Sequence, residues 1–455
     1  MNRLIVVSNR VAEPGNPAQA GGLAVGVLDA LRASGGLWFG WDGTTTESDQ
    51  QQKVKITSIG GITLATMPLS TQDYQDYYHG FSNSILWPVC HNRLDLADIN
   101  SGAIGGYRRV NESFAAALAT LIKPGDLIWV HDYHLIPLGV ALRQHGIANR
   151  IGFFLHVPFP APDVFAAAPE HEWLMQCLLA YDVVGFQTTS DVTNFERSRH
   201  ELHTRAQQGG RGQDWPNSSP VVAAFPISID VDAFAEMART KEADMRIERL
   251  NRRASALVHI IGVDRLDYTK GLPERLRSFR RLLELFPENQ KVATLMQIAP
   301  PTREDVDAYA DIRHELEALS GAINGEFGDF DWTPVRYIHR AVPRETLAAL
   351  FRGSHVGLVT PLRDGMNLVA KEYVAAQEAD NPGVLVLSRF AGAAEELVEA
   401  LIVNPYDADE AAKAMQQAIT MPLDERCQRH GALLQRIRQH DVKYWREHFL
   451  SALAG

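Results

Sequence analysis

The sequence predicts an α/β protein of two domains, each built around a parallel β-sheet. Short runs of β-branched and other apolar residues alternate with amphipathic stretches of helical periodicity, which is typical of strands and helices that follow one another around parallel sheets. In addition, a chain of 455 residues exceeds what one hydrophobic core usually supports. Two domains of about 200 residues each are therefore expected.

The strands expected in the first domain are short and almost wholly apolar, as buried strands of a parallel sheet are. They lie at Leu4–Val7, Leu127–Val130, Ile151–Leu155 and Val183–Phe186. The stretch from 207 to 220 is rich in Gly, Gln, Asn and Ser. It is typical of a loop rather than a domain boundary, because a strand-like run follows it at once.

A proline-containing segment, Phe225–Asp230, and a charged helical stretch precede a second set of strands. These are expected at Leu257–Val263, Val292–Ile298, Val356–Thr360 and Val384–Leu387. We therefore predict a first domain at 1–228 and a second at 229–438.

The C-terminal segment, at about 439–455, is expected to form an amphipathic helix. One helical face carries Val442, Trp445, Phe449 and Leu453. An apolar face of this kind must pack on a partner, and the first domain is one candidate.

Composition excludes several classes of function. The net charge of -11 opposes binding along a nucleic-acid backbone, so no nucleic-acid partner is expected. No stretch approaches the length of a membrane span, and the N-terminal apolar run is too short for a signal peptide. The three cysteines, Cys90, Cys177 and Cys427, match no disulfide or zinc spacing, which favours a reducing, cytoplasmic compartment.

Two cations follow the strand that ends at Val263. Arg265 and Lys270 are five positions apart in the loop after it, and the carboxyl ends of parallel strands converge on the crevice where ligands bind. A diphosphate leaving group needs such charge where no metal ion supplies it.

Two segments of the first domain carry further candidates. Ser8-Asn9-Arg10 leads into a glycine-containing loop, 21–26, whose backbone N–H groups could approach a phosphate, although a plain connection is equally compatible. Asp132 and His156 end two neighbouring strands, where such side chains can hold sugar hydroxyls or simply cap helices.

In the second domain, Arg303 follows two prolines that hold the chain extended, although a solvated ion pair is slightly favoured for it. After Thr360, Asn367 can cap a helix whose first N–H groups, at Leu368 and Val369, would face an anion. Glu372 could hold ribose hydroxyls or pair with a neighbouring Lys or Arg.

Two Asp-x-Asp patterns, at 230–232 and 329–331, have the spacing that metal-dependent enzymes use. With 55 acidic residues, chance matches are expected, and Asp230 stands where a helix cap is needed. We predict no essential metal and no cofactor.

Together, six motifs resemble the trehalose-6-phosphate synthases through nearly the whole chain: Ser-Asn-Arg, Gly-Gly-Leu-Ala-Val-Gly, His-Asp-Tyr-His, Phe-Phe-Leu-His-Val-Pro-Phe-Pro, Arg-Leu-Asp-Tyr-Thr-Lys-Gly and Pro-Leu-Arg-Asp-Gly-Met-Asn-Leu-Val-Ala-Lys-Glu. The resemblance implies a GT-B glycosyltransferase, in which two Rossmann-like domains face an interdomain cleft. It also implies transfer from UDP-glucose to glucose 6-phosphate with retention, the first domain binding the acceptor and the second the nucleotide sugar.

The same resemblance implies roles for individual residues. Those that resemble acceptor ligands are Arg10, Tyr78, Trp87, Asp132 and Arg303. Those that resemble donor contacts are Gly22, Arg265, Lys270, Asp364, Leu368, Val369 and Glu372, with His156 and Asp364 at the transferred glucose. Where bacterial members can carry an aromatic residue near the uracil, this chain has Val342, so the base contact stays open.

No carboxylate is an obvious nucleophile, so we expect same-face attack in which Arg265, Lys270, His156 and Asp364 form the catalytic group. The expected partners are two small-molecule substrates, with a homo-oligomer possible. Two alternatives stay open, a synthase that uses another phosphorylated acceptor such as glycerol 3-phosphate, and a non-catalytic sugar-phosphate sensor.

Overall fold

The computed structural model describes residues 3–11, 31, 35–47, 53–99, 102–208, 219–252, 258–302 and 307–455. It divides into two compact units. Unit 1 comprises Met1–Pro226 and Lys443–Gly455, and unit 2 comprises Ile227–Val442.

The described part of unit 1 contains an eight-stranded sheet in the order β3-β4-β2-β1-β5-β6-β7-β8. Every neighbouring pair is parallel except β3 and β4. The strands are β1 (Leu4–Arg10), β2 (Leu37–Thr46), β3 (Lys55–Ile59), β4 (Ile62–Ser70), β5 (Leu127–His131), β6 (Ile151–Phe154), β7 (Val183–Phe186) and β8 (Val221–Ala224).

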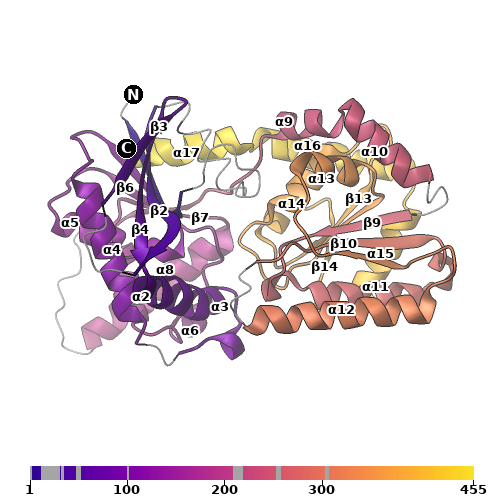
Figure 1. Cartoon of the computed structure of the whole chain (residues 1–455), viewed down its shortest axis with the longest axis horizontal. Coiled ribbons are helices and arrows are strands. Elements are labelled where there is room, and N and C mark those ends of the chain that lie inside the picture. Colours follow the sequence, from indigo (N-terminus) through magenta and orange to yellow (C-terminus); the bar gives the residue numbers. More distant parts are fainter. Residues whose placement is uncertain are drawn as a thin grey trace. The chain divides into compact units, whose positions relative to one another are not determined.

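The longer helices of unit 1 cover this sheet, and the shorter ones connect strands to them (Figure 1). They are α2 (Thr71–Asp73), η2 (Tyr74–Leu86), α3 (Trp87–Cys90), η3 (Leu94–Leu96), α4 (Ile104–Ala119), η4 (Tyr133–Leu135), α5 (Leu138–Gln144), α6 (Pro162–Phe165), α7 (His171–Leu178), α8 (Thr189–Gln208) and α17 (Val442–Ala454).

The last helix, α17, is drawn in yellow beside the purple strands of unit 1 (Figure 1). Trp445, Phe449 and Leu453 are buried, and the ring of Phe449 stacks on Trp129 with centroids 4.6 Å apart. A Cβ at Gly152 would lie 2.8 Å from the Phe449 ring. Glycine in β6 therefore allows the helix to pack directly on the sheet.

The described part of unit 2 contains a six-stranded parallel sheet in the order β11-β10-β9-β12-β13-β14. Its strands are β9 (Val258–Val263), β10 (Ala293–Ile298), β11 (Val335–Ile338), β12 (Val356–Val359), β13 (Val384–Ser388) and β14 (Leu401–Val403).

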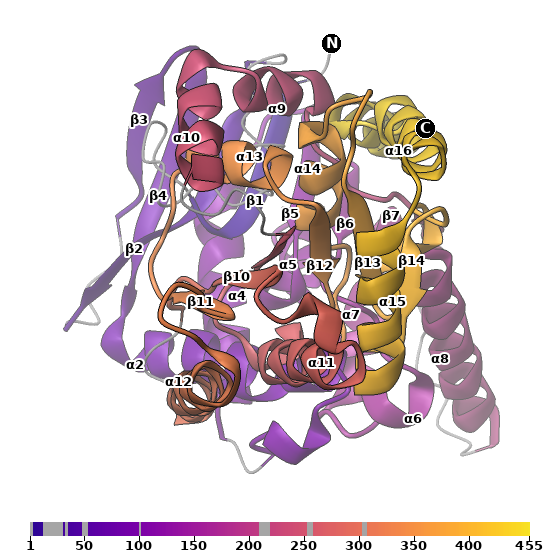
Figure 2. The same cartoon turned by 90° about the vertical axis from the view of Figure 1, so that its right-hand side faces the viewer.

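Helices cover both faces of this second sheet (Figures 1 and 2). On one side lie α11 (Leu272–Leu285), α12 (Asp307–Phe327) and α15 (Ala408–Thr420). On the other lie α9 (Val231–Ala238), α10 (Lys241–Arg252), α13 (Arg344–Arg352), α14 (Leu368–Ala376) and α16 (Leu423–Gln439), and short turns are η5 (Tyr268–Lys270), η6 (Pro287–Asn289) and η7 (Gly392–Glu395).

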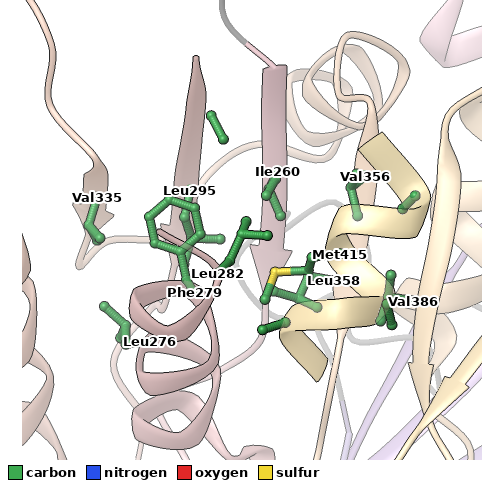
Figure 3. Close-up of a cluster of buried hydrophobic side chains, with 14 of the residues drawn as sticks. Ile260, Leu276, Phe279, Leu282, Leu295, Val335, Val356, Leu358, Val386 and Met415 are labelled. Atoms are coloured by element: carbon green, nitrogen blue, oxygen red, sulfur yellow. The ribbon is translucent and has the colours of Figure 1, made fainter. Parts of the chain in front are cut away.

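The core beneath α11 explains why the strands of unit 2 are apolar runs. Phe279 and Leu282 from α11 and Met415 from α15 pack on Ile260 and Leu295 from the strands (Figure 3). Because helices cover both faces, strands such as β12 are buried at every position.

The α/β class with parallel sheets is the one that the sequence predicts, and the expected strands agree with the observed ones to within about three residues. The prediction omits β2, β3 and β4 in unit 1 and β11 and β14 in unit 2. The edge strand β3 is exposed at all five positions, so its residues do not form an apolar run. Asp230 caps α9, since its carboxylate accepts a hydrogen bond from the Ala233 N–H at 3.0 Å.

Candidate functional site

Each sheet has a point at which the chain reverses the direction of strand addition. In unit 1 this point lies between β1 and β5, and in unit 2 between β9 and β12. Ligands of open α/β sheets bind beyond the carboxyl ends of the strands at such switch points. The segments that directly follow β5, β9 and β12 contain Asp132, Arg265, Lys270 and Asp364.

In unit 2, Lys270 and Asp364 form an ion pair with Nζ and Oδ2 2.5 Å apart. Lys270 lies in the turn after β9 and Asp364 in the loop after β12, and both side chains are largely buried. Gly271 allows the turn to approach β12, because it has φ 61 and a Cβ there would lie 2.8 Å from the Thr360 carbonyl oxygen. The switch point thus brings two predicted catalytic residues together.

Asn367 occupies the position before α14 in the left-handed conformation, with φ 74. The prediction that its side chain caps this helix is wrong. Its Nδ2 instead donates to Asp364 Oδ2 at 3.0 Å and to Asp264 Oδ1 at 3.3 Å. The first N–H groups of α14, at Leu368 and Val369, therefore donate no hydrogen bond to the Asn367 side chain and remain available to an anion.

A buried ion pair lies behind this loop, and the sequence analysis missed it. Arg275 of α11 donates to Asp264 at 2.7 Å, to Thr360 at 3.0 Å and to Gln297 at 3.2 Å. The Arg275 side chain has no exposed surface and that of Asp264 has 3%. The network joins residues at the ends of β9, β10 and β12, and its member Asp264 accepts the hydrogen bond from Asn367. Asp264 directly precedes Arg265, which is the one signal of its role in the sequence.

The second predicted diphosphate ligand, Arg265, differs from Lys270. Its side chain is half exposed, and its guanidinium lies 4.0 Å from the carboxylate of Asp267. Asp267 itself is fully buried and accepts hydrogen bonds from the backbone and the hydroxyl of Thr269. Lys270 is thus held in place, whereas Arg265 extends from the same loop toward solvent.

Glu372 pairs with Arg344 across the start of α13, with Nη2 and Oε1 3.2 Å apart. Burial raises the pKa of this carboxyl, and the charge of Arg344 partly offsets the rise. Lys371 faces another way, since it is fully buried against Glu396 and the Ile227 carbonyl. Val342 is half-buried in the loop two residues before Arg344, so it lies in the same segment as the partner of Glu372.

In unit 1, Arg10 ends β1 and is exposed, with its guanidinium 5.7 Å from the centroid of the Trp41 ring. Tyr78 lies 5.6 Å from the same ring and stacks on His134 at 5.9 Å. Tyr78 belongs to η2, a 13-residue π-helix, and Trp87 begins the helix that follows. Long π-helices are rare and occur often at functional sites.

Trp87 is buried, with its ring 5.8 Å from that of Tyr133. Tyr133 follows Asp132 at the end of β5, so the π-helix and the β5 loop face each other. Trp41, Tyr133 and His134 were not predicted as site residues. The motif His-Asp-Tyr-His contains two of them, and Trp41 lies on β2, which the sequence analysis did not recognise.

Asp132 has φ 77, a conformation that costs a residue other than glycine about 1 kcal/mol or more. It accepts a hydrogen bond from the backbone N–H of His156 at 3.2 Å. His156 in turn contacts His131, with ring nitrogens 3.0 Å apart. Burial lowers the pKa of His156 to about 3 and that of His131 well below its usual value. Both imidazoles are therefore neutral near pH 7.

Two predicted ligands, Gly22 and Arg303, lie outside the described residues. Within the ranges that the structure describes, no group of three or more His, Cys, Asp or Glu side chains is arranged to hold a metal ion, and no helix is long and apolar enough to cross a membrane. In the second Asp-x-Asp pattern, Asp329 forms an ion pair with Lys291. No disulfide joins the three cysteines, all of which the structure describes.

Comparison with known proteins identifies the family. The model of glycosyltransferase family 20 matches residues 5–455. The chain belongs to glycosyltransferase family 20. Trehalose-6-phosphate synthase of Klebsiella pneumoniae subsp. pneumoniae is 50% identical over 458 residues, which cover 100% of this chain and 95% of that protein.

Solved structures of similar proteins agree with this membership. A UDP-forming alpha,alpha-trehalose-phosphate synthase from Burkholderia xenovorans in complex with glucose-6-phosphate is 47% identical, with a TM-score of 0.91 and 100% of both chains covered. A trehalose-6-phosphate structure from E. coli bound with UDP-2-fluoro glucose is 46% identical, with a TM-score of 0.92 and 99% of both chains covered. The fold of this glycosyltransferase is therefore GT-B.

Proposed function

We propose that this enzyme transfers glucose from UDP-glucose to glucose 6-phosphate, giving alpha,alpha-trehalose 6-phosphate and UDP. The observation that carries the proposal is identity of about half of all residues, over the whole chain, to curated trehalose-6-phosphate synthases. The arrangement of ionic side chains at the β9/β12 switch point supports it, because a nucleoside diphosphate needs cations and helix N–H groups at such a position.

In this proposal the donor binds to unit 2. Arg265 and Lys270 hold the diphosphate, and the N-terminus of α14 at Leu368 and Val369 contacts the nucleotide. Glu372 accepts hydrogen bonds from the ribose hydroxyls, which the pairing with Arg344 permits because a carboxylate has about four acceptor positions. Gly22, which lies outside the described residues, is the remaining predicted donor contact.

Val342 would lie near the uracil ring. An aliphatic side chain supplies contact area without the stacking that an aromatic ring adds, so the preference for UDP over other nucleotides depends on backbone contacts to the base. The donor comparison described below measures this preference.

The acceptor binds to unit 1. In unit 1, Arg10 and Tyr78 hold its phosphate, Asp132 holds sugar hydroxyls, and Trp87 forms the apolar side of the pocket. Arg303, which belongs to unit 2 and lies outside the described residues, is predicted to bind the same phosphate. The rings around Tyr78 and Trp87 support this assignment, since sugars present apolar faces to aromatic side chains while their hydroxyls are held at the edge.

The chemistry follows from the charges. The bond between glucose C1 and the diphosphate oxygen lengthens, positive charge develops at C1, and negative charge develops on the leaving phosphate. The acceptor hydroxyl attacks from the face that the phosphate leaves, and its proton passes to the departing phosphate oxygen. The new bond therefore has the α configuration of the donor.

Lys270 and Arg265 accelerate this step because they lie where the negative charge grows. Removal of one such donor typically lowers kcat on the order of 100-fold to 1,000-fold. Asp364 contacts the hydroxyls of the transferred glucose, and its ion pair with Lys270 keeps the sugar and diphosphate ligands in a fixed relation. His156, neutral at pH 7, contributes a hydrogen bond to the same glucose.

Only small-molecule substrates are required, and we expect a cytoplasmic location, where both substrates are made. Since the cations act on the leaving group, activity should not depend on an added metal ion.

The test is a product assay with UDP-, ADP- and GDP-glucose against glucose 6-phosphate and glycerol 3-phosphate, each with and without a chelator. We expect UDP and trehalose 6-phosphate in equal amounts, only when UDP-glucose and glucose 6-phosphate are both present, and with both glycosidic bonds α by NMR. UDP release without acceptor, a glycerol-containing product, or no product at all would each exclude the proposal.

A further inference from the structure

A second histidine, His131, lies directly behind His156. His131 ends β5 and His156 follows β6, and these strands are neighbours in the sheet, so the two rings face each other at 5.2 Å between centroids. Nδ1 of His131 and Nε2 of His156 are 3.0 Å apart. The side chain of His131 has no exposed surface, whereas that of His156 is partly exposed.

This contact leaves Nδ1 as the nitrogen of His156 that a ligand can reach. No described residue forms a hydrogen bond with it. Whether this Nδ1 carries a proton depends on His131, because a neutral imidazole has one N–H and one bare nitrogen. If His131 donates through Nδ1–H to Nε2 of His156, then His156 must carry its own proton on Nδ1. If His156 donates instead, its Nδ1 is bare.

The surroundings of His131 favour the first arrangement. The rings of Trp129 and Trp445 lie 4.6 Å and 6.4 Å from it, and the indole N–H of each is buried without a partner among the described residues. An indole N–H can only donate. Nε2 of His131 is likewise buried without a hydrogen-bond partner among the described residues. A bare Nε2 places one acceptor near the two indole donors, whereas an Nε2–H would place a third unpaired donor near them.

We propose that His131 is a positioning residue that holds His156 in the Nδ1–H tautomer, so that His156 presents a hydrogen-bond donor to the transferred glucose. The proposal rests on the proposed function for the identity of the ligand, while the tautomer itself is independent of it. Helix α17 contributes to these surroundings, since the ring centroid of Trp445 lies 6.4 Å from that of His131 and 6.3 Å from that of His156.

The kinetic test compares two substitutions of His131. Asn can place its amide Nδ2 near the position of the histidine Nδ1, so it retains the donor, whereas Leu fills similar space without one. We expect His131→Leu to lower kcat for trehalose 6-phosphate formation about 10-fold, with the KM for glucose 6-phosphate changed less than about twofold. His131→Asn should recover most of the lost turnover.

The matched control is His259→Leu. His259 is a buried histidine of unit 2 outside the proposed site, and burial lowers its pKa too. Its kcat should stay within about twofold of the parent. Thermal unfolding of all three variants shows whether each is folded at the assay temperature.

The direct test measures the tautomer in the unsubstituted enzyme by 15N NMR of labelled histidines, with the His156→Gln variant assigning the signal. A protonated Nδ1 and a bare Nε2 on His156 support the proposal, and the reverse overturns it. Equal loss of kcat in His131→Leu and His131→Asn, with both folded, also overturns it. If the parent makes no trehalose 6-phosphate, the proposed function fails while the tautomer measurement still decides this point.

Discussion

The two switch points occupy the same place in their sheets but differ in chemistry. In unit 2 the loops after β9 and β12 carry ionic pairs, Lys270 with Asp364 and Asp264 with Arg275. In unit 1 the described residues at the ends of β5 and β6 lie among aromatic rings and neutral imidazoles, and the guanidinium of Arg10, at the end of β1, lies near Trp41.

This difference shows that topology provides the position of a site and side chains determine its ligand. A leaving group that gains charge during the reaction needs cations already in place, and the buried network of unit 2 holds Lys270 there. A sugar phosphate that gains no charge needs one anion contact and a surface for the sugar ring. Three substitutions test whether the two sites divide the work in this way, and a fourth tests the neutral imidazole of His156 in unit 1.

The largest effect is expected for Lys270→Ala. It removes a cation from the leaving group, so kcat should fall on the order of 100-fold to 1,000-fold, with donor affinity changed less. Steady-state kinetics of UDP release measure both. The control is Lys413→Ala, at an exposed position of α15, which should leave kcat and donor affinity unchanged. A kcat within about threefold of the parent would remove the electrostatic basis of the comparison.

The next effect is expected in unit 1, for Arg10→Ala. Loss of a charged hydrogen bond to phosphate should raise the KM for glucose 6-phosphate about 10-fold to 100-fold and leave the KM for UDP-glucose nearly unchanged. Arg93→Ala, which removes the ion pair with Asp95, serves as the control. Arg303, which lies outside the described residues, is predicted to bind the same phosphate and should respond as Arg10 does. Equal weakening of both substrates would contradict the division between the units.

A smaller effect is expected for Glu372→Gln. The amide keeps the shape but loses one of the acceptors that ribose hydroxyls would use, so the KM for UDP-glucose should rise about 10-fold. Glu378→Gln is a matched control, because Glu378 also pairs with an arginine of α13. If both variants raise this KM alike, the cause is the loss of a contact that stabilises α13 and not the loss of a hydrogen bond to the ribose.

The last effect is expected on stability in acid rather than on turnover. His156 has a folded-state pKa of about 3, below the value of about 6.5 in an unfolded chain, so the folded protein binds fewer protons. Its contribution is fully present above pH 6.5 and is lost as the pH falls toward 3, with a slope of at most about 1.4 kcal/mol per pH unit.

Urea unfolding of the parent and of His156→Gln between pH 7 and pH 4 checks this. The variant should show the shallower decline in free energy of unfolding. Parallel curves would mean that His156 becomes protonated in the folded protein as readily as in the unfolded chain.

Much of the fold was predictable because a strand buried between two layers of helices must be apolar along its whole length. This applies to β7 and β12, which the sequence locates well. It does not apply to β3, which is exposed. Nor does it apply to the π-helix η2, whose hydrogen bonds between residues i and i+5 do not give the 3.6-residue period of an α-helix. The assignment of individual ligands remains a prediction.

By itself, the sequence determined the α/β class, the two sets of strands and the positions at which polar residues follow strand ends, because burial and turn chemistry are local properties. Only the tertiary structure decided the partners: Lys270 with Asp364, 94 positions away, Asn367 with Asp264 rather than with its own helix, and His131 with His156. A hydrogen bond forms between groups that the order of strands in the sheet brings together, and that order is a property of the whole chain.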